Sequence, residues 1–537
     1  MCQQAPQGAP FATFSRGTLI FFAVVQVIGL KWVLQHLQNS GFVEVPPWVP
    51  FIDRSNCGLY KPLEYIVTSR KVITPDGTFP AAVHVKEGRI VDVKAVNGKA
   101  SQSNLTHAAM LTFGIKHILD YEDLVVAPGL IDTHVHMDQP GRTNWEGMET
   151  ATRAAAAGGI TTVIDMPLNN EPTTTTSRLV EQKIWASWGE LMVDTGFWGG
   201  IVPDNAGHHN TLQSMVDAGV LGFKSFMIPS GINDFPNVGE EDIRKALPFL
   251  KQAGVPYYVH AELQLDESSP GECSGDEADP TQHATWLASR PPKMEYDAIK
   301  LLIRLLDEDK TPAEPGFTLH VAHLANADAL PMIEAAKKKG LPITVETCTH
   351  YLTFSAESVP EGATWFKCAP PLRAKANQDK LWEAVKAGKI DGVASDHSPC
   401  PPDMKEMESG NFMKAWGGIA GLQYGLPGTW NGMRKRGMKP EDLTRLWSTH
   451  AAKLAGMQHR KGALAAGMDA DIVVWNPDGL ADTSLEHLKQ RWNVTPYEDL
   501  ELYGQVYATF VRGHLVYSLA DDVSKSVCGK TVLKQHL

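Results

Sequence analysis

Hydrophobic and polar positions along the chain form a repeating pattern of short apolar runs and amphipathic stretches. Apolar residues recur at helical spacing in stretches such as 149–157, 240–253, 296–306, 327–338 and 378–387. Eight short apolar runs alternate with these stretches and fit buried strands: 129–136, 161–166, 196–201, 221–227, 257–262, 318–323, 343–349 and 392–397. Eight β/α units predict an α/β protein with a (β/α)₈ TIM barrel over residues 126–462.

Strand patterns also stand at both ends of this region. Residues 65–68, 82–85 and 90–93 read as strands joined by turns, and so do 471–475 and 508–516. We predict that residues 57–125 and 463–537 build one small β-sandwich domain from both chain ends. An acidic, Ser- and Gly-rich stretch at 265–280 is predicted to be a surface insertion after the fifth barrel strand.

The N-terminal 44 residues differ from the rest. No acidic residue precedes Glu44, and 19–30 is apolar except for Gln26. Bulky residues at 31–36 replace the small residues of a signal cleavage site, which favours an uncleaved signal anchor. An organelle transit peptide is the alternative, although one Arg and one Lys are few for it. We expect this segment to direct the protein to the endoplasmic reticulum or another membrane, with a cytosolic form as the alternative.

Composition narrows the function classes. The chain has 49 basic and 61 acidic residues, a net charge of −12, and no basic stripe, which argues against nucleic-acid binding. Its seven cysteines lack regular spacing, which argues against a disulfide scaffold or a zinc knuckle. We expect Cys348, Cys368 and Cys400, near predicted strand ends, to be reduced thiols.

Candidate metal ligands stand where the predicted barrel strands end. His134 and His136 alternate along the first strand, so both imidazoles face the same way and can bind one divalent ion. A lone His-x-His pair is more often structural, but further polar side chains end later strands: Asp165, His260, Glu262, His320, His323, His350 and Asp396. Imidazoles with a carboxylate suit zinc, and iron, cobalt or manganese are alternatives.

Lys224 is unusual because it lies inside the apolar run 220–227. A buried ammonium group is costly unless it is paired, so one interpretation is an ion pair with a barrel carboxylate. The other is a neutral amine that takes up carbon dioxide and becomes an anionic carbamate between two metal ions.

Several longer stretches resemble the cyclic amidohydrolase branch of the metal-dependent amidohydrolase superfamily, and within it the allantoinase family. They are 141–147, 166–169, 288–291, 395–402 and 411–421, and the resemblance covers about residues 60 to 520. It implies two divalent ions bridged by carboxylated Lys224. It also implies the remaining ligands: His134, His136 and Asp396 on the more buried ion, and His260 and His323 on the outer one.

The same resemblance implies the reaction, which is hydrolysis of the hydantoin ring of (S)-allantoin to allantoate. A hydroxide between the ions would be the nucleophile, and Asp396 would take its proton and return it to the leaving nitrogen. The resemblance also implies a homo-oligomer, which in this family is often a tetramer. His320 is expected to be structural.

One difference from related dihydroorotases indicates which substrate the site prefers. Related dihydroorotases carry, two residues after the second histidine, an Arg that binds the substrate carboxylate, whereas this chain has Asp138. A carboxylate there repels an anion, so a neutral cyclic ureide fits better. Asn169 and the backbone of Cys368 and Ala369 are expected to contact the ring and ureido amides. Two alternatives stay open: a dihydropyrimidinase or hydantoinase, and a non-catalytic dihydropyrimidinase-like scaffold protein.

Overall fold

A computed structural model of the chain describes residues 57–60, 62–96, 106, 109–110, 112–265 and 278–537. The expected signal anchor and most of the expected insertion at 265–280 lie outside these residues. Within the part that the structure describes, no helix combines the length and the apolar character needed to cross a bilayer.

The predicted barrel is confirmed. Its parallel strands pair in chain order, and a bridge between Val135 and His397 brings the end of the last strand beside the first. The third predicted run is split into two short strands, β8 and β9. The strands are β6 (Leu130–Val135), β7 (Ile160–Asp165), β8 (Asp194–Phe197), β9 (Gly199–Gly200), β10 (Phe223–Phe226), β11 (Tyr257–His260), β12 (Leu319–Val321), β13 (Ile343–Cys348) and β14 (Gly392–Ala394).

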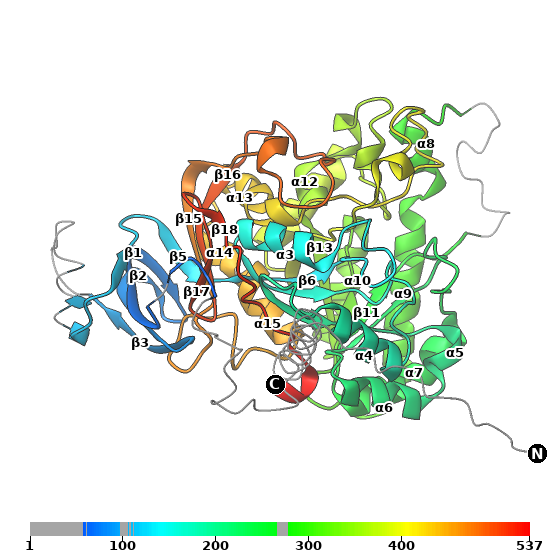
Figure 1. The fold of residues 1–537 in the computed structure, drawn as a ribbon. Coiled ribbons are helices and arrows are strands. Elements are labelled where there is room, and N and C mark those ends of the chain that lie inside the picture. The colour runs from blue at the N-terminus through cyan, green and yellow to red at the C-terminus, as the bar shows by residue number, and fades with distance from the viewer. Residues whose placement is uncertain (1–56, 61, 97–105, 107–108, 111, 266–277) are drawn as a thin grey trace, which may run out of the picture. The chain divides into compact units, whose positions relative to one another are not determined.

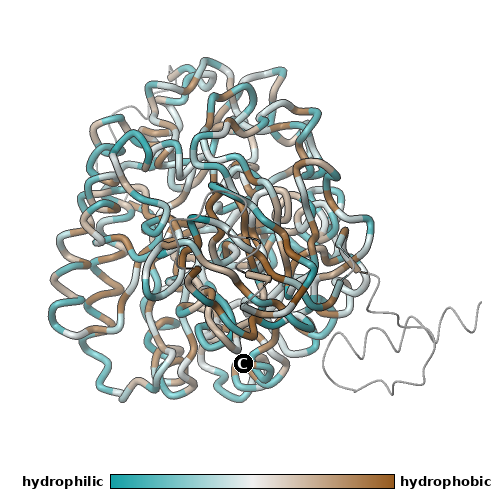
Figure 2. The backbone as a smooth tube through the Cα atoms, turned by 90° about the vertical axis from the view of Figure 1, so that its left-hand side faces the viewer, coloured by the Kyte–Doolittle hydropathy of each residue, from teal (hydrophilic) through white to brown (hydrophobic). Residues whose placement is uncertain are grey.

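Helices alternate with the barrel strands, and the longer ones bury one apolar face. In α7 (Glu240–Ala253), Ile243, Ala246 and Leu250 are buried at helical spacing, and the helix ends at Gly254 with a left-handed φ of 59°. In Figure 2 several helices alternate between brown and teal along their turns, as amphipathic helices do. The other helices are α3 (Met148–Ala157), α4 (Ser177–Ala186), α5 (Pro203–Ala206), α6 (His209–Ala218), α8 (His283–Ser289), α9 (Pro292–Glu308), α10 (Leu330–Lys338), α11 (Thr349–Thr353), α12 (Lys375–Lys386), α13 (Gly425–Lys435), α14 (Pro440–Thr444) and α15 (His450–Leu454).

The second sheet takes strands from both ends of the chain, as predicted for the β-sandwich. Its order is β18-β17-β16-β15-β5-β1-β2-β3, with β4 paired to β1, and Figure 1 shows blue β1 and β2 near red β17. The chain passes into the barrel at Gly129, directly after β5. The strands are β1 (Glu64–Thr74), β2 (Gly77–Lys86), β3 (Arg89–Ala95), β4 (Ile118–Asp120), β5 (Val125–Pro128), β15 (Ile472–Leu480), β16 (Tyr503–Val511), β17 (His514–Ser518) and β18 (Asp522–Val523).

One disulfide joins Cys57 to Cys528, which are 471 positions apart in sequence. Cysteine spacing did not predict it, because spacing reveals frameworks of several close cysteines and not one pair joined through the fold. The expectation for Cys348, Cys368 and Cys400 is confirmed, since all three are free and buried.

Candidate metal centre

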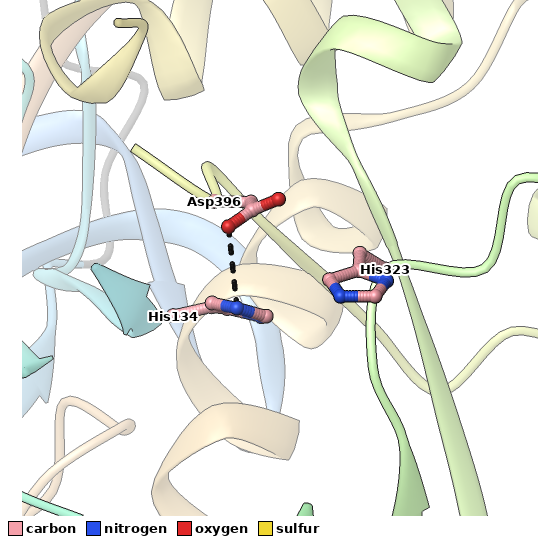
Figure 3. A group of neighbouring side chains, drawn as sticks. All are labelled: His134, His323 and Asp396. Carbon is pink, nitrogen blue, oxygen red and sulfur yellow. Dashed lines mark ion pairs between the residues drawn. The ribbon is translucent and has the colours of Figure 1, made fainter. Parts of the chain in front are cut away.

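Three of the predicted ligands lie together at the ends of the barrel strands. Ligand atoms of His134, His323 and Asp396 all lie within 4.8 Å of one another, and all three side chains are buried (Figure 3). Nε2 of His134 is 3.2 Å from Oδ1 of Asp396, and Nε2 of His136 is 3.6 Å from the same oxygen. Two imidazoles and a carboxylate at these separations can hold a divalent ion.

Lys224 and His260 lie on the neighbouring strands β10 and β11. The ring centroids of His260 and His323 are 4.5 Å apart. Nζ of Lys224 and Nδ1 of His323 are buried without a hydrogen-bond partner among the described residues. Buried polar atoms are normally paired, so two orphaned nitrogens beside this cluster fit an additional ligand such as a metal ion. Burial lowers the pKa of Lys224 to about 8.

Glu346 supports the first histidine from behind. Its Oε1 lies 2.6 Å from Nδ1 of His134, which leaves Nε2 of that ring to face Asp396. Its other oxygen is 3.2 Å from Nε2 of His320, whose Nδ1 lies 2.8 Å from the Thr344 hydroxyl. His320 therefore has the contacts of a structural histidine. Sequence reasoning missed Glu346; the one available signal was a carboxylate inside the apolar run 343–349.

Glu262 orients His260, at the end of β11, as Glu346 orients His134. The imidazole of His260 lies 2.7 Å from Oε2 of Glu262 through its Nε2, so its Nδ1 is the atom free for a metal. Arg290 also binds Glu262, with Nε 3.2 Å from Oε1. Burial raises the pKa of Glu262, but His260 and Arg290 outweigh it and lower the value to about 2. An ionised carboxylate of this kind orients a ligating histidine and makes it more basic.

Asp396 is held as an anion in an uncommon backbone conformation. Burial raises the pKa of its carboxyl group, but His134 and His136 outweigh burial and lower it to about 2. Its φ is 45°, and that of His323 is 36°, both in the left-handed region that non-glycine residues rarely adopt. Such strain is maintained at functional sites where the surrounding structure fixes the side chain.

Two other residues at predicted strand ends have different partners. Asp165 pairs with Lys183 at 2.6 Å and accepts a hydrogen bond from the backbone of Met137, so it supports the barrel wall. His350 forms a second possible ligand group with Cys348 and Asp396. Sequence reasoning placed His350 at a strand end without assigning it a role.

A cavity of about 430 Å³ lies beside the cluster, with His260 and Ala369 in its lining. The carbonyl of Cys368 accepts a hydrogen bond from the indole of Trp286 at 2.9 Å. The side-chain nitrogen of Asn169 lies 3.2 Å from Nδ1 of His136, so this amide contacts a candidate ligand. Of the three predicted substrate contacts, Ala369 is the one that lines the cavity.

Comparisons with known proteins agree with this geometry. Residues 125–516 match the Amidohydrolase family, and residues 61–123 match "Allantoinase, composite domain". The chain is 44% identical to an allantoinase from Arabidopsis thaliana, over 89% of this chain and 93% of that protein. It is 43% identical to an allantoinase from Streptomyces avermitilis, over 84% of this chain and 95% of that protein. Among solved structures, the L-hydantoinase (dihydropyrimidinase) from Arthrobacter aurescens aligns with a TM-score of 0.77 and 27% identity, over 88% of this chain and 100% of that one. The chain belongs to the amidohydrolase family and, within it, to the allantoinases.

Proposed function

We propose that this enzyme hydrolyses allantoin to allantoate by opening the hydantoin ring. The observation that carries the proposal is the buried cluster of His134, His323 and Asp396 at the strand ends of the barrel. Membership of the allantoinases supports allantoin as the substrate. The reaction adds water across one ring amide, so the site has to supply a nucleophile, polarise a carbonyl and protonate a nitrogen.

The proposed ligand set is the one that the family resemblance implies. His134, His136 and Asp396 would hold one divalent ion and His260 and His323 a second, and Lys224 would contribute to both as a carbamate. Zinc suits these donors best, and manganese, cobalt or iron are alternatives. Such ions, when bound, would supply an activated water and an electrophile for the ring carbonyl.

Asp396 is the proposed general base and then general acid. Because His134 and His136 keep it ionised, its carboxylate can accept a proton from the attacking water and later give it to the leaving ring nitrogen. Its Oδ1 faces both histidines, which fixes the carboxylate in one orientation. The second oxygen is then available for the proton.

Asp138 supports a neutral substrate. It is buried at the end of β6, and neither carboxylate oxygen has a hydrogen-bond partner among the described residues. Burial, with Asp165 and Glu146 nearby, raises the pKa of this carboxyl group well above its usual value. The position therefore offers no cation to bind a substrate carboxylate, unlike the Arg of dihydroorotases, and a neutral ring fits better. We propose that Asn169, Cys368 and Ala369 complete the contacts with the ring amides.

The second candidate is a hydantoinase or dihydropyrimidinase, which the alignment with the Arthrobacter aurescens enzyme favours. The deciding experiment measures hydrolysis of racemic allantoin and of dihydrouracil by the full-length protein, with the metal content of the same sample. Turnover of one allantoin enantiomer, about two metals per chain and loss after chelation support the proposal. Turnover of dihydrouracil alone supports the second candidate. No turnover and no bound metal, even after bicarbonate and zinc are supplied, supports a scaffold.

We also propose a homotetramer associated with the endoplasmic reticulum or another membrane. The Cys57–Cys528 disulfide supports an oxidising compartment for the region that follows the N-terminal segment. Cell fractionation, with alkylation of free thiols before and after reduction, tests the location. A reduced pair in a cytosolic fraction contradicts it. Light scattering at several protein concentrations tests the tetramer.

A further inference from the structure

Two cationic side chains meet over one indole ring in the wall of the 430 Å³ cavity. Nζ of Lys367 lies 4.1 Å from the ring centroid of Trp286, and the guanidinium carbon of Arg290 lies 5.3 Å from a ring centroid of the same side chain. Both cations line the cavity that His260 also lines. An aromatic face stabilises nearby cations, so Trp286 fixes the two groups beside one space.

The charges of these two residues are balanced differently. Arg290 binds the Glu262 carboxylate through Nε, at 3.2 Å, and through Nη2. Lys367 is buried, and its hydrogen bonds go to two main-chain carbonyls, those of Ala415 at 2.6 Å and Met413 at 3.4 Å. It has no ion pair with a carboxylate of the described residues. An ammonium group has three donors, so one remains for a ligand.

A second lysine adds to the positive charge behind the wall. Lys405 is also buried, and its Nζ binds the carbonyls of Trp416, at 3.2 Å, and Gly418. Burial, followed by repulsion from Lys405 and Arg290, lowers the pKa of Lys367 to about 8. Among the described residues that line the cavity, Glu406 is the one acidic residue. Its carboxylate accepts a hydrogen bond from the Ser409 hydroxyl at 2.7 Å. Lys367 is therefore a cation of this wall that pairs with no carboxylate of the described residues.

We propose that Lys367 and Arg290 form a carboxylate-binding subsite, which binds the carboxylate of the ring-opened product. This inference rests on the proposed function. In that reaction the water oxygen bonds to the ring carbonyl carbon, the ring carbon–nitrogen bond breaks, and the nitrogen leaves with a proton. The new carboxylic acid then loses its proton. Substrate is neutral and product is an anion, so a cationic wall favours product over substrate.

The test compares the inhibition constant of allantoate with the KM of allantoin. Lys367→Gln removes the charge while its amide can still donate to the Ala415 carbonyl, and Lys367→Arg restores a cation. Lys414→Gln is the matched control, because Lys414 lines the same cavity but is exposed to solvent. We expect Lys367→Gln to raise the inhibition constant of allantoate, divided by the KM of allantoin, about tenfold, as loss of a charge-assisted hydrogen bond does. Lys367→Arg should restore it, and Lys414→Gln should change it less than about twofold.

Acetate separates a general carboxylate subsite from one that needs the product's ureido groups. If acetate inhibits the parent enzyme competitively and loses this effect in Lys367→Gln, the subsite accepts carboxylates in general. If only allantoate inhibition responds, the subsite is specific for the product. Equal changes in both constants, or an equal effect of Lys414→Gln, overturn the inference. An enzyme without allantoin turnover contradicts the proposed function instead, and calorimetric titration with acetate then tests the subsite directly.

Discussion

Nδ1 of His134 lies 2.6 Å from Oε1 of Glu346, and both side chains are almost fully buried. This contact fixes the orientation of the imidazole, so that its Nε2 faces Asp396 at 3.2 Å. Burying the carboxylate and the imidazole is costly, and the hydrogen bond between them offsets part of this cost, because no water reaches them at this depth. Glu346 is thus a positioning residue for the proposed centre.

Glu346→Gln tests this role while keeping the shape of the side chain. The amide is a weaker acceptor than the carboxylate, so His134 loses orientation and basicity. We expect metal affinity to fall by about 10- to 100-fold. Metal retained after dialysis against graded chelator measures this change, and Glu357→Gln, at an exposed position, is the control. Unchanged metal retention in Glu346→Gln would show that the contact is dispensable.

Lys224→Ala tests the proposed bridge. The side chain is buried and its nitrogen has no hydrogen-bond partner among the described residues, so removing it deprives the proposed ions of a ligand and leaves no broken ion pair. We expect bound metal and allantoin turnover to be lost while circular dichroism stays like that of the parent protein. Reconstitution of the metal-free parent with zinc should also be faster with bicarbonate than without it. Full activity of the variant would disprove the bridge.

The sequence predicts the local features of this protein better than its distant contacts. Alternation of apolar runs predicts β6 to β14, and the spacing of His134 and His136 predicts that they share a face. Neither pattern carries information about which carboxylate lies behind His134, since Glu346 is 212 positions away. The disulfide from Cys57 to Cys528 depends in the same way on how both chain ends meet in one sheet.

Lys461 makes another distant contact that the sequence does not predict, and this contact joins the barrel to the β-sandwich. Its buried Nζ lies 2.8 Å from Asp194 of β8 and 2.5 Å from Asp471, the residue before β15. Lys461→Met removes the cation of Asp471, whereas Asp194 keeps its ion pair with Arg512. Breaking a buried pair in this way costs about 3 to 5 kcal/mol. We expect a clearly lower thermal midpoint, measured by calorimetry.

A second variant distinguishes lost charge balance from lost packing. Adding Asp471→Asn to Lys461→Met removes one stranded charge, so it should recover part of the lost stability. An equally low midpoint in the single and double variants would attribute the effect to packing.

His283, which lies outside the proposed metal centre, should make the stability of the protein depend on pH. It begins α8, its buried ring packs edge-on against Phe412 at 5.5 Å, and neither ring nitrogen has a hydrogen-bond partner among the described residues. Burial, together with the charge of Arg373, lowers its pKa to about 4. The unfolded chain, with a pKa of about 6.5, therefore binds more protons than the folded chain between these values. The contribution of His283 to the free energy of unfolding is therefore fully present above about pH 6.5 and decreases as the pH falls towards 4.

At pH 5 this loss amounts to about 2 kcal/mol, because one pKa unit corresponds to about 1.4 kcal/mol. His283→Leu keeps an apolar contact with Phe412 and removes the titrating group. We expect the difference in thermal midpoint between pH 7.5 and pH 5 to be smaller in this variant than in the parent protein. His208→Leu, at an exposed position, should leave the difference as it is. If His283→Leu shows the full pH dependence of the parent, His283 is protonated in the folded state at pH 5, and the acid sensitivity comes from other groups.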